Sequence, residues 1–325
     1  MRSAIHSTFG EPAEVLSLGE SPLPEPAEGQ VRVRTILSPI HNHDLWTVRG
    51  NYGYKPELPA IGGSEAVGTV DALGAGVEGI AIGQRIAVAG VHGTWAEYFL
   101  APAASLIPLP DAITDEQGAQ IIAMPFSAIT LIEFMGVEPG DWVIQNTANG
   151  AVGKAVAMLG AARGVNVISL VRRDAAISEM EALGIGHVIS TETEGWQDRV
   201  REMTKGASIR AGVDSIGGKA SGEMLGLLGE KALLVSFGNM TDGGMEISSG
   251  DLIFKQATVK GFWAAKVNET LPRADMARLM GELITQVAEG KLLLPVDGIY
   301  GLDQAREAVT ASLTAGKSGK VLFRP

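Results

Sequence analysis

The stretch Asp141–Arg173 constrains the fold of this chain more than any other part of the sequence. The apolar run Trp142–Ile144 leads into small and polar residues, then Gly150 and Gly153, and then an apolar helical stretch. This order predicts a strand, a glycine turn and a helix. A glycine turn at the start of a helix lets a phosphate group approach bare backbone, where free N–H groups and the helix dipole favour anions. Gly153 also allows the helix to pack closely on its strand. The stretch therefore predicts a nucleotide-binding unit.

The end of the next predicted strand, Val165–Leu170, indicates which nucleotide is bound. Arg172 and Arg173 follow it, and Arg172 lies 172 − 153 = 19 residues after Gly153. A site that selects NAD has an acidic residue at about this distance, to bind the ribose hydroxyls. Two arginines suit the 2′-phosphate of NADPH instead, because a guanidinium group binds phosphate through two parallel hydrogen bonds. An ordinary turn beside two solvated arginines is the alternative, but the flanking strands and helix favour an NADPH site.

Composition excludes several classes of protein. A chain of 325 residues with 46% hydrophobic and 19% charged residues is typical of a soluble α/β enzyme with two domains. Its net charge of −11, without a basic stripe, argues against nucleic acid and anionic membranes as partners. It has no cysteine, so disulfides, thiol catalysis and cysteine zinc sites are excluded. No segment has the pattern of a signal peptide or a membrane span, and we expect a cytoplasmic protein.

The pattern of apolar residues divides the chain into two parts. Residues 1–115 carry β signals interrupted by Pro and Gly, whereas residues 116–289 alternate between strands and helices, which predicts a parallel sheet covered on both faces. Residues 290–325 are expected to rejoin the first domain through a last strand, Ser318–Phe323. The other predicted strands are Val31–Arg34, Glu65–Ala72, Arg85–Ala89, Trp95–Leu100, His187–Ser190, Ala211–Ser215 and Leu233–Phe237. Leu279, Met280, Leu283, Ile284 and Val287 mark one face of an amphipathic helix that ends at Gly290.

Several short segments carry a resemblance to a known family. They are Gly50–Gly53, Pro56–Ala60, Ile144–Asn146, Val171–Arg172, Ile216–Lys219, Leu252–Lys255 and Gly261–Trp263. Through them the chain resembles the medium-chain dehydrogenases/reductases over nearly its whole length, and within that superfamily the mitochondrial-type 2-enoyl thioester reductases. The resemblance implies a GroES-like β domain followed by a Rossmann domain with a doubly wound parallel sheet. It also implies NADPH-dependent reduction of an activated C=C bond. Related quinone reductases share this architecture and remain an alternative, as does a cofactor-binding protein without turnover.

The resemblance implies two catalytic residues. Tyr52 lies where the enoyl reductases keep a tyrosine that donates a proton, and a phenol can donate to a developing carbanion. A loop aromatic that only packs its ring is the alternative, and Tyr54 is a weaker candidate for the same role. His41 lies where the family has Asn, which orients substrate and nicotinamide, and His43 lies where it has Ser. These two departures leave the acceptor open between an enoyl thioester, a quinone and an enone.

The resemblance also implies contacts with NADPH and a homodimer. An edge strand, Ala257–Trp263, would be covered by the second subunit. Phe262 and Trp263 would edge the nicotinamide pocket, although core or interface packing is equally compatible with them, and Lys320 could equally be a solvated lysine. The substrate would be a small molecule or an acyl thioester. The predicted cofactor residues are Met124, Asn149, Gly150, Ala151, Val152, Gly153, Arg172, Arg173, Phe237, Gly238, Asn239, Met240, Phe262, Trp263 and Lys320.

No metal is expected, although the superfamily includes zinc alcohol dehydrogenases. Those enzymes bind zinc through a Cys, a His that follows Gly and precedes Glu, and a second Cys. Here His41 and Ser64 stand at the first two positions, and no cysteine exists for the third. Catalytic zinc usually has three protein ligands, and a third ligand beside His41 and His43 is not apparent.

Overall fold

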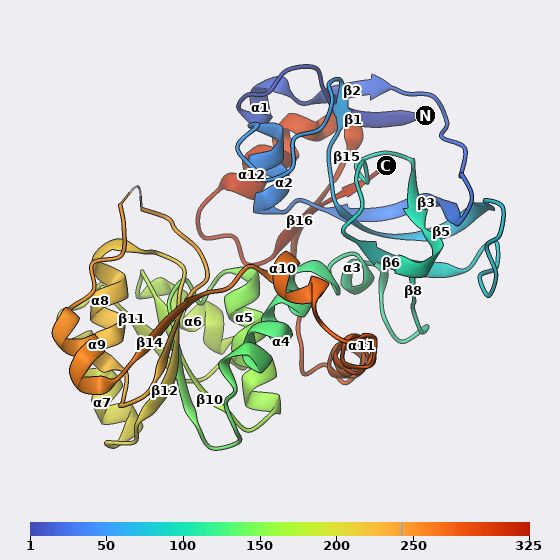
Figure 1. Cartoon of the computed structure of the whole chain (residues 1–325). Helices are drawn as coiled ribbons and strands as arrows, with labels where there is room; N and C mark the ends of the chain where they lie inside the picture. The colour runs from blue at the N-terminus through green and yellow to red at the C-terminus, as the bar shows by residue number, and fades with distance from the viewer. Residues whose placement is uncertain (242) are drawn as a thin grey trace. The chain divides into compact units, whose positions relative to one another are not determined.

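The computed structural model describes residues 1–241 and 243–325, which form two compact units (Figure 1). Unit 1 comprises Met1–Ala123 and Leu294–Pro325, and unit 2 comprises Met124–Leu293. The sequence-based boundaries after residues 115 and 289 lie 123 − 115 = 8 and 293 − 289 = 4 residues before these limits. The short helix α3 (Asp115–Gly118) explains the first difference, because it packs on strands of unit 1.

Unit 2 contains a six-stranded parallel sheet in the order β11-β10-β9-β12-β13-β14. Its strands are β9 (Trp142–Gln145), β10 (Asn166–Val171), β11 (Val188–Ser190), β12 (Ile209–Asp214), β13 (Leu233–Ser236) and β14 (Thr258–Gly261). The chain runs outward from β9 to β11 and then returns to β12 on the other side of β9. This is the doubly wound arrangement predicted from the sequence, in which ligands generally bind at the carboxyl ends of the strands where the strand order reverses, here β9 and β12.

Helices cover both faces of this sheet (Figure 1). The helices assigned to this part of the chain are α4 (Ala123–Met135), α5 (Ala151–Ala162), α6 (Ala175–Glu181), α7 (Trp196–Thr204), α8 (Gly218–Leu227), α9 (Ser249–Lys255), α10 (Ala264–Glu269) and α11 (Arg273–Ala288), and among them α5, α6, α7 and α8 contact its strands. In α11, Leu279, Met280, Leu283 and Val287 are buried, which confirms the predicted apolar face. One core cluster joins Ile144 and Ile168 of the sheet to Leu225 of α8.

Unit 1 is mainly β structure. One sheet has the order β15-β16-β3-β5-β6-β8, with β7 also paired to β3, and a smaller sheet has the order β2-β1-β4. The strands are β1 (Arg2–His6), β2 (Ser17–Glu20), β3 (Gln30–Pro39), β4 (Ala60–Ile61), β5 (Glu65–Leu73), β6 (Arg85–Ala89), β7 (Tyr98–Pro102), β8 (Ile107–Pro108), β15 (Val296–Gly301) and β16 (Lys320–Arg324). Helices α1 (Pro12–Val15), α2 (Asn42–Val48) and α12 (Ala305–Leu313) and two short 3₁₀ turns, Ala103–Ser105 and Leu302–Gln304, complete it.

The last strand returns to the first part of the chain, as the sequence predicted. β16 pairs antiparallel with β3, with Leu322 opposite Pro39. Trp95 and Phe323 are fully buried and lie 5.2 Å apart between ring centroids, in a core that includes Leu45 and Val48 of α2. This packing holds the start of α2 beside β16, and the candidate site is built at that point.

Candidate active site

The first turn of α2 carries three polar side chains of the site. His41 precedes the helix in an extended conformation, and its backbone N–H donates to Asp44 Oδ2 at 3.0 Å. An acidic residue in a first turn accepts from free N–H groups and interacts favourably with the helix dipole. The local sequence therefore holds the Asp44 carboxylate at the start of α2, where its Oδ1 lies 3.5 Å from His43 Nε2.

His41 and Glu65 form a buried pair next to His43, whose ring lies 5.0 Å from that of His41. His41 Nε2 lies 2.7 Å from Glu65 Oε2, and both side chains are fully buried. Glu65 Oε1 accepts from the backbone N–H groups of Ile122 and Ala123 at 2.8 and 2.9 Å. Burial raises the pKa of Glu65 to about 7, although these N–H groups oppose the shift. Burial, with the nearby Lys320, lowers the pKa of His41 well below its ordinary value.

His41 bonds to Glu65 through only one of its two ring nitrogens. His41 Nδ1 is buried and has no hydrogen-bond partner among the described residues. One proton lies between His41 Nε2 and Glu65 Oε2. A protonated Glu65 donates it from Oε2 to Nε2, because Oε1 already accepts from two backbone N–H groups, whereas an ionised Glu65 accepts it from Nε2. His41, which the sequence suggested as catalytic, is thus enclosed in this structure. His41 therefore affects the site indirectly, through its contacts with Glu65 and with Asp44 at the start of α2.

Lys320 lies at the start of β16, next to this pair. Its Nζ donates to the backbone oxygen of Ile40 at 3.3 Å. Burial lowers the pKa of Lys320 to about 8, against the attraction of Asp44 and Glu65. The structure thus places Lys320 with the residues at the start of α2.

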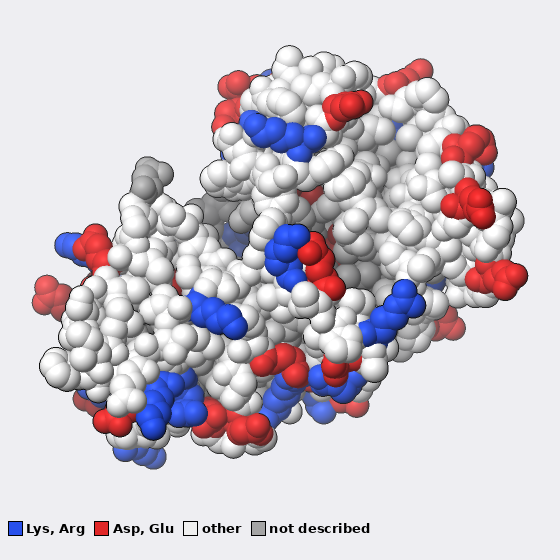
Figure 2. All heavy atoms as spheres, in the orientation of Figure 1, with Lys and Arg blue, Asp and Glu red and all other residues white. Residues whose placement is uncertain are grey.

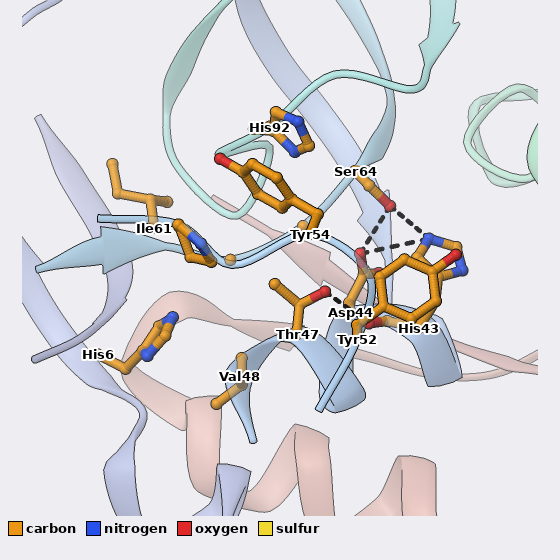
Figure 3. Close-up of a pocket in the computed structure, with 13 residues that line it drawn as sticks. His6, His43, Asp44, Thr47, Val48, Tyr52, Tyr54, Ile61, Ser64 and His92 are labelled. Atoms are coloured by element: carbon orange, nitrogen blue, oxygen red, sulfur yellow. Dashed lines mark hydrogen bonds and ion pairs between the residues drawn. The ribbon is translucent and has the colours of Figure 1, made fainter. Parts of the chain in front are cut away.

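The open part of the site is a pocket of about 70 Å³ in unit 1 (Figure 3). This volume accommodates a small functional group rather than a whole acyl chain. Polar and aromatic side chains dominate its lining, and these are His6, His43, Asp44, Thr47, Tyr52, Tyr54, Ser64 and His92. Figure 3 shows His43, Ser64 and Asp44 joined by hydrogen bonds on one side of the pocket, with the ring of Tyr52 beside them.

The two tyrosines of the pocket have different surroundings. Tyr52 is 39% exposed, its ring lies 5.7 Å from that of His43, and its hydroxyl makes no hydrogen bond with another described residue. Tyr54 stacks on His92 at 4.0 Å between centroids. Tyr52 is the tyrosine that lies next to the hydrogen-bonded side chains, and its hydroxyl is available to a ligand.

In unit 2, the predicted phosphate loop lies between β9 and α5. Thr147 adopts a positive φ of 50°, and Gly150 precedes the first turn of α5. A Cβ at Gly153 would lie 2.7 Å from Ala148 Cα, so a side chain there would force the helix away from the loop. Together with Asn149, Ala151 and Val152, these residues present backbone at a helix N-terminus, as a diphosphate site requires.

The other predicted cofactor residues of unit 2 follow neighbouring strands. Exposed Arg172 and half-buried Arg173 come after β10, which pairs in parallel with β9, so they leave the same edge of the sheet as the loop. Phe237, Gly238, Asn239 and Met240 follow β13 at that edge, and Met240 is exposed.

Phe262, Trp263 and Met124 have mixed surroundings. Phe262 is buried and packs on Phe134 and Phe237, at 5.2 and 5.8 Å between centroids. Trp263 is exposed, and Met124 is half-buried in α4. Phe262 therefore contributes to packing at this edge, whereas Trp263 is free to contact a ligand or another chain.

Sequence reasoning missed four residues that shape the two units. It gave no role to Asp44, Glu65 or Asp214, and it considered Ser64 only as a replaced zinc ligand. Asp214 Oδ1 accepts from the Asn146 amide at 2.6 Å, and its carboxylate also accepts from Ser221 and from backbone N–H groups after β12. An acidic residue that ends an apolar strand was the available signal. The adjacent pairs His43-Asp44 and Ser64-Glu65 were the signals in unit 1.

The described residues provide neither a metal-binding cluster nor a membrane-spanning helix. Among them, no group of three His, Asp or Glu side chains could hold a metal ion. No helix in the ranges 1–241 and 243–325 is both long and apolar enough to cross a membrane. On the face in Figure 2, Lys and Arg are interspersed with Asp and Glu, without a continuous basic surface.

Comparisons with known proteins identify the family. Residues 27–111 match the alcohol dehydrogenase GroES-like domain, and residues 151–282 match the zinc-binding dehydrogenase family. The chain is 32% identical to the mitochondrial enoyl-[acyl-carrier-protein] reductase of Homo sapiens, over 99% of this chain and 88% of that protein. It is 30% identical to the enzyme of that name from Xenopus tropicalis, over 99% and 95%.

Solved structures agree with this assignment. A protein from Bacillus thuringiensis, provisionally named NADPH:quinone reductase, has a TM-score of 0.91 and 27% identity, over 100% of this chain and 98% of that one. A mycobacterial protein solved with NADPH has a TM-score of 0.87 and 25% identity, over 100% of both chains. Because these likenesses extend over both units, the chain belongs to the medium-chain dehydrogenase/reductase superfamily and is an oxidoreductase, as the sequence motifs predicted.

Proposed function

We propose that this protein uses NADPH to reduce an activated C=C bond, with a 2-enoyl thioester as the acceptor. The observation that carries the proposal is Tyr52, a partly exposed residue that lines the unit 1 pocket and whose hydroxyl has no hydrogen-bond partner among the described residues. The enoyl reductases that the chain matches at 30 to 32% identity support this acceptor class.

Unit 2 has the features that an NADPH site needs. The Gly150 loop offers backbone N–H groups at the start of α5, and Gly153 has no room for a side chain. Arg172 and Arg173 follow the neighbouring strand β10, and they would bind the 2′-phosphate. Among the described residues, Arg173 has one ion pair, a long one of 3.9 Å with Glu179, so its guanidinium is available to an anion. When bound, NADPH supplies a hydride to the β-carbon of the acceptor.

Tyr52 would complete the reaction with a proton. Addition of hydride at Cβ moves an electron pair toward the thioester oxygen and leaves an enolate. The Tyr52 hydroxyl then donates its proton to Cα, which forms the saturated thioester. Because Tyr52 is partly exposed, the resulting tyrosinate regains a proton from solvent. General acid catalysis of this kind contributes roughly 10²–10⁴ in rate.

Quinone reduction is the second candidate. The structural likeness to the Bacillus thuringiensis protein and to a similarly named Mesorhizobium loti protein, at 27% and 26% identity, favours it. Reduction of a quinone needs no proton on carbon, since its product carries the protons on oxygen. Dependence on Tyr52 therefore separates the two functions.

The test is Tyr52→Phe, assayed with crotonyl-CoA and with a quinone. The substitution keeps the ring and removes the donated proton, so we expect kcat with crotonyl-CoA to fall by roughly 10²-fold or more, while NADPH affinity changes little. Quinone reduction should change far less. Tyr54→Phe asks whether the other pocket tyrosine contributes. Tyr98→Phe is the matched control, because Tyr98 lies on β7 outside the pocket.

Two results would count against the proposal. An active parent enzyme whose crotonyl-CoA reduction survives Tyr52→Phe unchanged would show that Tyr52 is not the acid. Reduction of quinones alone would establish the second function. A protein that oxidises NADPH with neither acceptor would favour a binding protein without turnover.

A further inference from the structure

Three side chains at the edge of the unit 1 pocket form a hydrogen-bonded chain whose direction is determined. Ser64 Oγ lies 2.6 Å from Asp44 Oδ1 and 2.8 Å from His43 Nε2. A carboxylate only accepts, so the single hydroxyl proton of Ser64 points to Asp44. Ser64 Oγ must then accept from His43, and the ring of His43 carries a proton on Nε2. Asp44 and Ser64 therefore fix both the orientation and the tautomer of His43.

The other ring nitrogen of His43 remains available. Nδ1 makes no hydrogen bond with a described residue, and it is not among the buried atoms that lack a partner. It therefore reaches the open side of the pocket or solvent. With Nε2–H committed to Ser64, the neutral ring offers Nδ1 as an acceptor, and the protonated ring offers a single N–H donor there. The Asp44 carboxylate lies 3.5 Å from Nε2.

Tyr52 and His43 are two adjacent groups on one pocket wall. Their rings are 5.7 Å apart with an interplanar angle of 30°, and both residues line the pocket (Figure 3). An enolate has two adjacent atoms that need stabilisation, the α-carbon and the oxygen. Two neighbouring donors match that requirement, whereas Tyr52 alone serves only one of the atoms.

We propose that His43 is a second catalytic residue, which donates from Nδ1 to the oxygen conjugated with the reduced C=C bond. The proposal rests on the proposed function and names a further part of its site. With a thioester, hydride adds at Cβ, the oxygen gains negative charge, and His43 holds it by a hydrogen bond until Tyr52 protonates Cα. With a quinone, His43 transfers its proton to the oxygen and regains one from solvent. The acceptor must therefore carry an oxygen conjugated with the bond.

The experiment compares His43→Gln with the parent, using crotonyl-CoA and a quinone. Gln retains an N–H that can donate to Ser64 but cannot present a second donor in the manner of Nδ1–H. We expect kcat to fall by roughly 10²-fold with both acceptors, the scale of a lost oxyanion donor, with little change in NADPH affinity. Tyr52→Phe, in contrast, should slow reduction of the thioester far more than reduction of the quinone. His187→Gln is the matched control, because His187 is an exposed histidine of unit 2 whose ring lies tilted against that of Trp142, at 5.0 Å between centroids.

Two further measurements separate chemistry from packing. His43→Ala should be partly restored by added imidazole, which a structural role would not allow. Nitrogen-15 spectra of the parent should show His43 with its neutral proton on Nε2, and Ser64→Ala should lose that single tautomer. Ser64 is a positioning residue, so its removal should lower kcat less than His43→Gln does.

The outcomes are distinct. A parent that reduces either acceptor, a slow His43→Gln variant and imidazole rescue together support the proposal. An active parent with unchanged turnover in His43→Gln, or a slow His43→Ala variant that imidazole does not restore, overturns it and leaves the proposed function intact. A parent that reduces neither acceptor overturns the proposed function and this inference with it.

Discussion

Replacement of Glu65 by Gln should make unit 1 less sensitive to pH. Glu65 is fully buried against His41, and burial raises its pKa from an ordinary 4.5 to about 7. Between these values the unfolded chain loses the Glu65 proton while the folded chain keeps it. The contribution of Glu65 to the unfolding free energy is therefore complete below pH 4.5 and is lost as the pH rises through 7.

The magnitude follows from the two pKa values. The interval 7 − 4.5 = 2.5, at 1.36 kcal/mol for each pKa unit, sets a limit of about 3 kcal/mol. Gln has the shape of a protonated carboxyl and does not titrate. It can still accept from the N–H groups of Ile122 and Ala123 through its oxygen. Relative to the parent, Glu65→Gln should therefore gain about 2 to 3 kcal/mol of unfolding free energy between pH 5 and pH 8.

The assay is urea unfolding at both pH values, read by hydrogen exchange of peptides from unit 1. A signal from the whole chain would mix two units. Glu11→Gln is the matched control, since Glu11 is an exposed carboxylate paired with Arg49 at 3.0 Å, which lowers its pKa. Between pH 5 and pH 8, the unfolding free energy of Glu11→Gln relative to the parent should change only slightly, and in the opposite direction to that of Glu65→Gln. The reasoning would be refuted if the difference in unfolding free energy between Glu65→Gln and the parent were the same at both pH values, or shifted in favour of the parent at pH 8. Glu65 would then be ionised throughout this range.

The remaining predictions concern cofactor, metal and assembly. Arg172→Ala combined with Arg173→Ala should weaken NADPH far more than NADH, because charge-assisted hydrogen bonds contribute about 1.5–3 kcal/mol each; equal affinity of the parent for both cofactors, measured by fluorescence titration, would contradict the assignment. Activity should survive chelation, and elemental analysis should find no stoichiometric zinc; EDTA inactivation reversed by zinc would show the opposite. Light scattering at micromolar concentration should give the mass of a homodimer, since β14 is the edge strand of its sheet and Phe254 nearby is 82% exposed; a monomer mass would rule it out.

The local sequence was enough to predict the helices and strands that have a periodic apolar pattern or begin at a glycine turn. The stretch Asp141–Arg173 predicted β9, α5 and β10, because an apolar strand, a glycine turn and an apolar helix leave few other arrangements. The alternation that follows predicted a parallel sheet, and the spaced apolar residues of α11 marked its buried face. Tyr52 and Arg172 became candidates through their short motifs.

Only the tertiary structure decided which polar side chains meet in unit 1. His43 and Ser64 are 21 residues apart, Glu65 lies 57 residues from Ile122, and Lys320 lies 280 residues from Ile40. Each of these contacts depends on β5 and β16 lying beside the start of α2, which strand pairing sets through non-local hydrogen bonds. Sequence therefore determined the types of residue available to the site, whereas packing determined that His41 is enclosed and that His43 is held, with one nitrogen available, at the pocket.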